Sequence, residues 1–291
     1  MHRRLLSVAA LVIVAQARAQ RPPSTDIFLA PLDIERGVPV IGAPVNITSR
    51  QGYDNQPSFT PDGSAILFTS IHEDGQSDIY RYDLVSKQIA RVTATPESEY
   101  SATVMHGGKR FSVIRVEKDS TQRLWSFALD GSDPRLVLEN AKPVGYHAWI
   151  DADNLALFVL GSPNALVHAD VRSGTSDTLA RAIGRSLHAL PKGSGFSFLQ
   201  RSDSAWALTL MSWPSRESRT VGTLPPGGED VAWLAADVVI ASSGSKIFYR
   251  RTGSSSWSVA ADLAAAGLAN VTRMSVSPDG RWLAIVAIPK S

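Results

Sequence analysis

A repeat with a period of about 45 residues runs through the sequence and constrains its fold more than any other feature. Each unit holds short apolar stretches separated by turn residues. The first stretch of each unit ends near an apolar anchor residue, and these anchors are Phe59, Val104, Trp149, Leu190, Trp233 and Val276. Repeats of this length and composition are typical of the four-stranded blades of a β-propeller.

The number of blades follows from the number of units and from the two ends of the repeat region. Residues 274–288 supply only the first half of a unit, and residues 26–48 resemble the missing second half. Closing the array in this way leaves no exposed strand edge at the junction. The sequence therefore predicts an all-β, six-bladed β-propeller closed by N- and C-terminal strands that share one blade, with seven blades as the alternative. Complete units are expected at residues 55–93, 98–138, 146–182, 186–221 and 231–260.

Residues 1–19 have the features of a signal peptide for export. Two arginines precede an apolar stretch, residues 5–15, that is too short to span a bilayer, and Ala-Arg-Ala at residues 17–19 offers a cleavage site. The mature chain, residues 20–291, would form a single propeller domain. The sequence contains no cysteine, which excludes lipid attachment at the cleavage site and disulfide bonds. We therefore expect a periplasmic or secreted protein that is not inserted into a membrane after cleavage.

Two motifs carry a resemblance to a known family. Residues 57–63 read Pro-Ser-Phe-Thr-Pro-Asp-Gly, and residues 78–84 read Asp-Ile-Tyr-Arg-Tyr-Asp-Leu. This pattern resembles the propeller repeats of the TolB-like family of exported bacterial proteins, and the resemblance extends over residues 26–289. It implies a six-bladed propeller that binds another molecule rather than one that catalyses a reaction.

The charge balance argues against one class of partner. The chain has 29 Lys and Arg against 27 Asp and Glu, a net charge of +2, and the basic residues are not clustered. Nucleic-acid-binding proteins normally present a basic patch, so no nucleic-acid partner is expected. The sequence also lacks a G-x-S-x-G nucleophile motif, an H-E-x-x-H zinc motif and a glycine-rich phosphate loop. No cofactor is expected, although a divalent metal ion stays open.

The candidate site lies where the first strand of each blade enters the central channel, because these strands line the channel of a propeller. His147 and His188 both fall two positions before an anchor, so they would occupy equivalent positions in neighbouring blades. Further polar side chains lie close to the starts of these strands. The candidate ligand-binding residues at this channel mouth are Asp54, Glu99, Tyr146, His147, Arg185, His188, Glu229, Asp230 and Arg273.

Two functions agree with this set of residues. The first is non-catalytic binding of a protein, peptide or glycan at the channel mouth, which the TolB-like resemblance and the lack of a catalytic motif favour. The second is a hydrolase or lyase in which His147 and His188 act as acid and base with Asp54 and Glu99. In that case the two histidines are also the expected ligands of a divalent metal. A third interpretation gives the histidines only a structural role, with hydrogen bonds to neighbouring loops.

Overall fold

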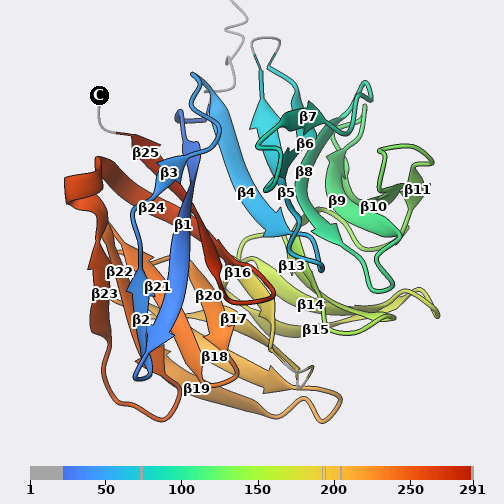
Figure 1. Cartoon of the computed structure of the whole chain (residues 1–291). Coiled ribbons are helices and arrows are strands. Elements are labelled where there is room, and N and C mark those ends of the chain that lie inside the picture. The colour runs from blue at the N-terminus through green and yellow to red at the C-terminus, as the bar shows by residue number, and fades with distance from the viewer. Residues whose placement is uncertain (1–21, 73–74, 192, 194, 204, 290–291) are drawn as a thin grey trace, which may run out of the picture.

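The computed structural model describes residues 22–72, 75–191, 193, 195–203 and 205–289. Within these residues the chain forms six antiparallel sheets arranged around a central axis (Figure 1). The prediction of a six-bladed β-propeller is confirmed, and the alternative of seven blades is wrong. The predicted signal peptide, residues 1–19, lies outside the described residues. No helix in the described part of the chain is long and apolar enough to cross a membrane.

Five blades are continuous in sequence, and each consists of four strands of which the first is innermost. Blade 1 contains β4 (Tyr53–Phe59), β5 (Ala65–Ile71), β6 (Ser77–Asp83) and β7 (Ile89–Arg91). Blade 2 contains β8 (Ser98–Val104), β9 (Arg110–Val116), β10 (Gln122–Ala128) and β11 (Arg135–Leu136). Blade 3 contains β12 (Val144–Trp149), β13 (Asn154–Val159), β14 (Ala165–Asp170) and β15 (Thr175–Arg181).

Blades 4 and 5 follow the same order of strands. Blade 4 contains β16 (Ile183–Ala189), β17 (Gly195–Ser202), β18 (Ala205–Ser212) and β19 (Ser218–Thr223). Blade 5 contains β20 (Val231–Ala235), β21 (Val238–Ser243), β22 (Lys246–Arg251) and β23 (Ser258–Asp262), and the short 3₁₀ helix η1 (Leu263–Ala266) comes after it. All five blades therefore begin and end within a few residues of the predicted units.

Blade 6 joins the two ends of the chain. Its order is β2-β1-β25-β24, so the N-terminal strand β1 pairs with the C-terminal strand β25 (Figure 1). Antiparallel pairing runs from Asp26 opposite Ala287 to Pro31 opposite Trp282. The predicted shared blade is confirmed. Its strands are β1 (Asp26–Glu35), β2 (Val38–Ile41), β3 (Val45–Asn46), β24 (Leu268–Val276) and β25 (Trp282–Pro289).

The outer edge of blade 6 holds two short strands, β2 and β3, where each of the other blades has one outermost strand. Here β1 continues past its partner β25 and turns back through Arg36 and Gly37, which have φ values of 51° and 82°. Two central turn residues with positive φ are what a tight hairpin requires. The returning chain forms β2 against the end of β1, and β3 then pairs with Phe28 and Leu29 nearer its start.

Apolar side chains pack between neighbouring blades rather than at the centre of the ring. Ile66 and Phe68 of blade 1, for example, pack against Ile27 and Val286 of blade 6, and each of these four is no more than 1% exposed. Burial of one such side chain is worth about 1.5–3 kcal/mol. The described residues form six clusters of this kind. The wall of the central channel, in contrast, holds several polar side chains, among them Gln56, His188 and Arg273.

Candidate functional site

A cavity of about 450 Å³ occupies the central channel and is lined by the innermost strands of all six blades. We call the end of the channel at which these strands begin the upper mouth, and the end at which they finish the lower mouth. The cavity extends from Gln56 and Tyr146, within the channel, to His106 and Pro191 in the turns of the lower mouth. It therefore lies deeper than the sequence analysis placed the site.

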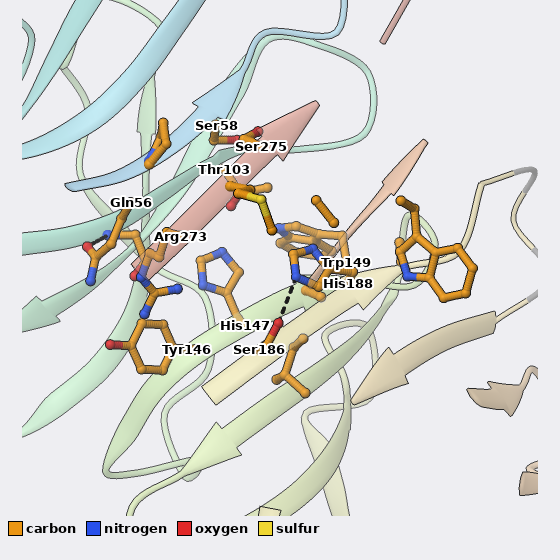
Figure 2. Close-up of a pocket in the computed structure, with 18 of the residues that line it drawn as sticks. Gln56, Ser58, Thr103, Tyr146, His147, Trp149, Ser186, His188, Arg273 and Ser275 are labelled. Carbon is orange, nitrogen blue, oxygen red and sulfur yellow. Dashed lines mark hydrogen bonds between the residues drawn. The ribbon is translucent and has the colours of Figure 1, made fainter. Parts of the chain in front are cut away.

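Six of the nine predicted site residues line this cavity. In Figure 2, Gln56, Tyr146 and Arg273 gather at one end, and the imidazoles of His147 and His188 lie further along. Glu229 does not line it; its side chain is 62% exposed and lies 3.8 Å from the Nη2 atom of Arg185. The predicted residues that line the cavity are Tyr146, His147, Arg185, His188, Asp230 and Arg273.

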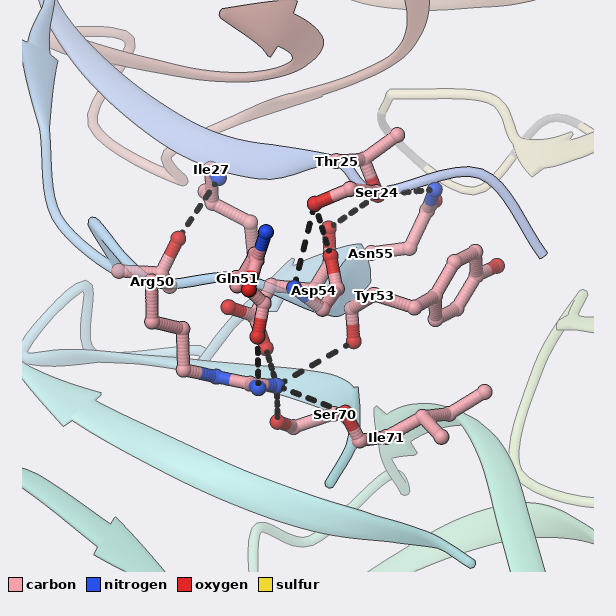
Figure 3. Close-up of polar contacts among 12 residues, drawn as sticks. Ser24, Thr25, Ile27, Arg50, Gln51, Tyr53, Asp54, Asn55, Ser70 and Ile71 are labelled. Carbon is pink, nitrogen blue, oxygen red and sulfur yellow. Dashed lines mark hydrogen bonds and ion pairs between the residues drawn. The ribbon is translucent and has the colours of Figure 1, made fainter. Parts of the chain in front are cut away.

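Asp54 lies between blades 1 and 6 and does not line the cavity. Its carboxylate is fully buried, and Oδ1 lies 2.5 Å from Nη2 of Arg50, which also contacts Ser70 (Figure 3). The Asp54 N–H donates to the carbonyl of Thr25 at 3.0 Å, and the Thr25 hydroxyl donates to the Asp54 carbonyl at 3.0 Å. Burial raises the pKa of the Asp54 carboxyl. These contacts hold the chain just before β1 against blade 1.

Glu99 occupies the same repeat position in blade 2 and is also fully buried away from the cavity. Its Oε1 atom accepts a hydrogen bond from the Thr95 hydroxyl at 2.5 Å and lies 3.4 Å from Nε of Arg115. No described residue hydrogen-bonds its Oε2 atom. Burial raises the pKa of Glu99 from 4.5, its ordinary value, to about 7. In both blades, then, this acidic position fills the joint between two blades.

A β-bulge explains why these two carboxylates point away from the channel. The pairing register shifts between Asn55 and Ser58 in β4 and between Tyr100 and Thr103 in β8. Gln56 and Ser101, at these shifts, have φ values of 57° and 56°. A bulge breaks the regular alternation of side chains along a strand. Residues before the bulge are thus not on the face that strict alternation from the anchor predicts.

His147 is fixed by a hydrogen-bond group in the wall of the cavity. Its Nε2 atom lies 2.7 Å from the Ser112 hydroxyl of blade 2, which also accepts from the indole N–H of Trp149 at 2.9 Å. The same hydroxyl lies 3.3 Å from the carbonyl of Thr103. Nδ1 of His147 is buried and has no hydrogen-bond partner among the described residues. Burial lowers the pKa of His147 to about 4, so the imidazole is neutral at neutral pH.

His188 is held in a different way. Its Nε2 atom lies 3.0 Å from the Ser186 hydroxyl on the same strand, and that hydroxyl accepts from the N–H of Val231 in blade 5. Burial is the main reason that the pKa of His188 is lowered; the nearby Arg273 lowers it further and Asp230 opposes the shift. His147 is therefore bound toward blade 2, and His188 toward blade 5.

The two histidines are not equivalent, and the prediction that they are is wrong by one residue. The backbone N–H groups of Ile150 and Leu190 donate across the turn that follows the first strand, to the carbonyls of Asn154 and Gly195 respectively. Trp149 therefore corresponds to Ala189, not to Leu190. By this register His147 corresponds to Leu187, and His188 lies on the opposite face of its strand.

Arg273 and Tyr146 close the cavity on the side of the upper mouth. The guanidinium carbon of Arg273 lies 4.6 Å from the centre of the Tyr146 ring, a cation–π contact (Figure 2). Asp230 lies in the same wall, but its Oδ2 atom accepts from the N–H of Met274 at 3.0 Å. Burial by itself would lower the pKa of Arg273, but Tyr146 and Asp230 hold it above its ordinary value. The arginine thus places a positive charge within the channel.

Sequence reasoning did not find two further features of the channel wall. Gln56 lines the cavity and its Oε1 atom accepts from the N–H of Ser101 at 2.9 Å, which joins blades 1 and 2. Trp233 donates its indole N–H to Ser197 of the preceding blade at 2.9 Å, as Trp149 does to Ser112. The second feature has a signal in the sequence: a Trp anchor follows a unit whose second strand carries Phe-Ser.

Comparisons with solved structures show the same fold. The chain resembles putative TolB from Agrobacterium tumefaciens with a TM-score of 0.71 and 14% identity, over 91% of this chain and 99% of that one. It resembles TolB from Acinetobacter baumannii with a TM-score of 0.61 and 12% identity, over 91% and 64% of the two chains. It also resembles an oligogalacturonate lyase in complex with manganese, with a TM-score of 0.53 and 12% identity, over 95% and 99%.

At these identities the comparisons establish a six-bladed propeller fold and confirm the TolB-like resemblance at that level. No family model matches the sequence. Among the described residues, no three or more His, Cys, Asp or Glu side chains lie close enough together to bind a metal ion. His147 and His188, the predicted metal ligands, are each hydrogen-bonded to a serine of the wall instead.

Proposed function

We propose that this protein binds an anionic segment of a protein, peptide or glycan in its central cavity, without changing it chemically. The ligand would enter from the lower mouth, which the cavity reaches at His106 and Pro191. We place this activity in the periplasm or outside the cell, because the first 19 residues of the sequence have the features of an export signal.

Unpaired arginine N–H groups are the observation that carries this proposal. Nη2 of Arg273 and Nε of Arg185 are buried, and neither has a hydrogen-bond partner among the described residues. No described carboxylate lies within ion-pair distance of Arg273. A buried donor without a partner costs about 1–3 kcal/mol, and more when it is charged. A ligand carboxylate would accept from these groups and remove that cost, with a charge-assisted hydrogen bond in return.

The similarity to TolB structures supports binding as the activity, by analogy of fold. The two imidazoles add to the wall in neutral form at neutral pH, since burial lowers the pKa of both. They would therefore serve as hydrogen-bond partners of the ligand rather than as further positive charges.

Fluorescence anisotropy with a labelled hexaglutamate peptide tests the proposal, and hexaglutamine is the uncharged reference probe. Arg273→Gln should weaken hexaglutamate binding about tenfold or more, the equivalent of roughly 1.4 kcal/mol. Arg201→Gln is the matched control, because it removes an arginine that stacks on Trp206 outside the cavity. Equal affinities of the two variants, or equal affinities of the wild type for the two peptides, would refute the proposal.

A second candidate function is a lyase that acts on an acidic glycan. It rests on the similarity to an oligogalacturonate lyase and on the bare Nδ1 atom of His147, a neutral base that lines the cavity. In such a reaction the base would remove a carbon-bound proton, the glycosidic C–O bond would break to leave a carbon–carbon double bond, and the departing oxygen would take up a proton from water to become a hydroxyl.

Incubation with oligogalacturonate, with and without added manganese, tests this candidate through the ultraviolet absorbance of the unsaturated product. Turnover that His147→Ala abolishes would establish the enzyme and overturn the non-catalytic proposal. Binding of oligogalacturonate without turnover, lost in Arg273→Gln, would support binding alone.

A further inference from the structure

A second pocket, of about 710 Å³, opens at the upper mouth, on the other side of Gln56 and Tyr146 from the channel cavity. It is lined by the beginnings of β4, β8 and β12, by residues that follow β5, by the end of β9 and by the start of β10, so blades 1, 2 and 3 build most of it. Its volume falls within the range of roughly 300–1,000 Å³ that is usual for small-molecule sites. The function proposed above places its ligand in the channel cavity and not in this pocket, although Gln56 and Tyr146 line both.

Three tyrosines dominate its wall. Tyr53, Tyr100 and Tyr146 come from the innermost strands of three consecutive blades, and each is partly exposed. Burial raises the pKa of Tyr53 to about 12; the nearby Arg273 and Arg185 oppose the rise, and Tyr146 and Tyr100 add to it. The three phenol groups line the same pocket, and that of Tyr53 keeps its proton at neutral pH. They offer ring faces and hydroxyl donors to the same ligand.

The remaining polar groups of the pocket are amides and one imidazole. Gln56 and Gln122 supply the amides, and the described residues form no hydrogen bond with the side chain of Gln122. The imidazole of His72 stacks on Tyr80, with 4.9 Å between the ring centres. Among the described residues that line the pocket there is no Asp, Glu, Lys or Arg. The pocket thus differs in chemistry from the channel cavity with its two arginines.

A sugar ring in the pyranose form fits this combination of groups. One of its faces consists of C–H bonds, which pack on the negative face of an aromatic ring. Its hydroxyls both donate and accept, as do phenol and amide groups. The described lining residues offer a carboxylated sugar no basic group, since Arg273 contacts Tyr146 from the side of the channel cavity, and a neutral sugar needs no such group. We propose that the upper mouth is a second binding site, for a neutral pyranose oligosaccharide, with Tyr100 as its principal stacking surface.

The test is isothermal titration calorimetry of the mature chain with cellohexaose, maltohexaose and hexa-N-acetylchitohexaose as neutral probes. At least one should bind, and Tyr100→Ala should weaken that binding about tenfold or more. Tyr100→Phe, which keeps the ring, should stay within about threefold of the wild type. Gln122→Ala should also weaken binding, and this residue is only partly buried, so its loss spares the fold.

Arg201→Gln is the control, because Arg201 stacks on Trp206 and lines neither the channel cavity nor this pocket. It should leave saccharide binding unchanged, and so should added salt, which screens charges but not stacking. The inference is overturned if no neutral probe binds, if Tyr100→Ala binds as the wild type does, or if oligogalacturonate binds more tightly than the neutral probes in a Tyr100-dependent way. None of these outcomes depends on whether hexaglutamate binds in the channel.

Discussion

Glu99→Gln should make the protein more stable at alkaline pH than the wild type. The carboxyl of Glu99 is fully buried in the joint between blades 1 and 2, where burial raises its pKa from 4.5 to about 7. Above pH 7 the folded protein therefore holds a buried charge whose Oε2 atom has no described partner. Glutamine keeps an oxygen that accepts from Thr95 and carries no charge.

The magnitude follows from the two pKa values. Below pH 4.5 Glu99 is protonated in the folded and the unfolded protein and contributes no pH dependence. Between pH 4.5 and 7 only the unfolded protein loses the proton, so the free energy of unfolding falls as the pH rises. A pKa difference of this size corresponds to about 3 kcal/mol in total. Above pH 7 the loss is complete.

His147 acts in the opposite direction over nearly the same range. Its pKa is lowered from 6.5 to about 4, so the unfolded protein binds more protons between these values and stability rises with pH. The wild-type profile combines both effects, and only the difference between variant and wild type isolates Glu99.

Urea unfolding followed by tryptophan fluorescence, from pH 4.5 to pH 8.5, measures this difference. The advantage of Glu99→Gln should grow by roughly 3 kcal/mol across the range and level off above pH 7. Glu97→Gln, which removes the other carboxylate that contacts Arg115, is the control and should show no such growth. A difference that stays constant with pH would refute the buried, ionisable role given to Glu99.

Three further predictions concern the fold. Ser112→Ala should lower the free energy of unfolding by about 2–5 kcal/mol, because it removes a hydrogen-bond partner from both Trp149 and His147. Ser197→Ala affects only the indole of Trp233 and should lower it by about 1–3 kcal/mol. Equal losses of the two variants in urea unfolding would contradict this. Deletion of residues 22–48 removes β1 and exposes the edge of β25, so the variant should aggregate, which size-exclusion chromatography would detect. A soluble variant with an unchanged melting temperature would argue against closure by this strand. Gly63→Val should lower the free energy of unfolding by about 1–3 kcal/mol through backbone strain at φ 69°. A steric clash is not the cause, because the atom nearest to the added Cβ lies 3.9 Å away. Calorimetry should find the affinity for hexaglutamate unaltered.

The fold was predictable because its signals repeat. The turn with Pro61 and Gly63 occurs again near the C-terminus, and the apolar second strands recur with one period. Such signals indicate the number and order of the blades even where single units are weak. The extra hairpin strand β2 has no counterpart in the other units, so the repeat gave no indication of it.

The candidate site was harder to predict because it depends on single-residue register. In blade 4 the residue equivalent to Trp149 is Ala189, which is small and exposed, so the repeat pattern favours the larger neighbouring Leu190 as the anchor. That error placed His188 on the wrong face of its strand. The positions of Asp54 and Glu99 depend on bulges that the sequence pattern does not mark, because no glycine stands at either shift.

The pairing of β1 with β25 also determines how the ring responds to mechanical force. Asp26 and Ala287 form the pair next to both chain ends, and Pro31 and Trp282 form the pair farthest from them. A pull on the two termini therefore first loads the contacts of Thr25 with blade 1 and then the hydrogen bonds between β1 and β25 one after another, from Asp26 inward, rather than all at once. Tension applied through the ends peels the strands apart at low force, whereas tension applied along both strands in opposite directions meets the whole ladder together.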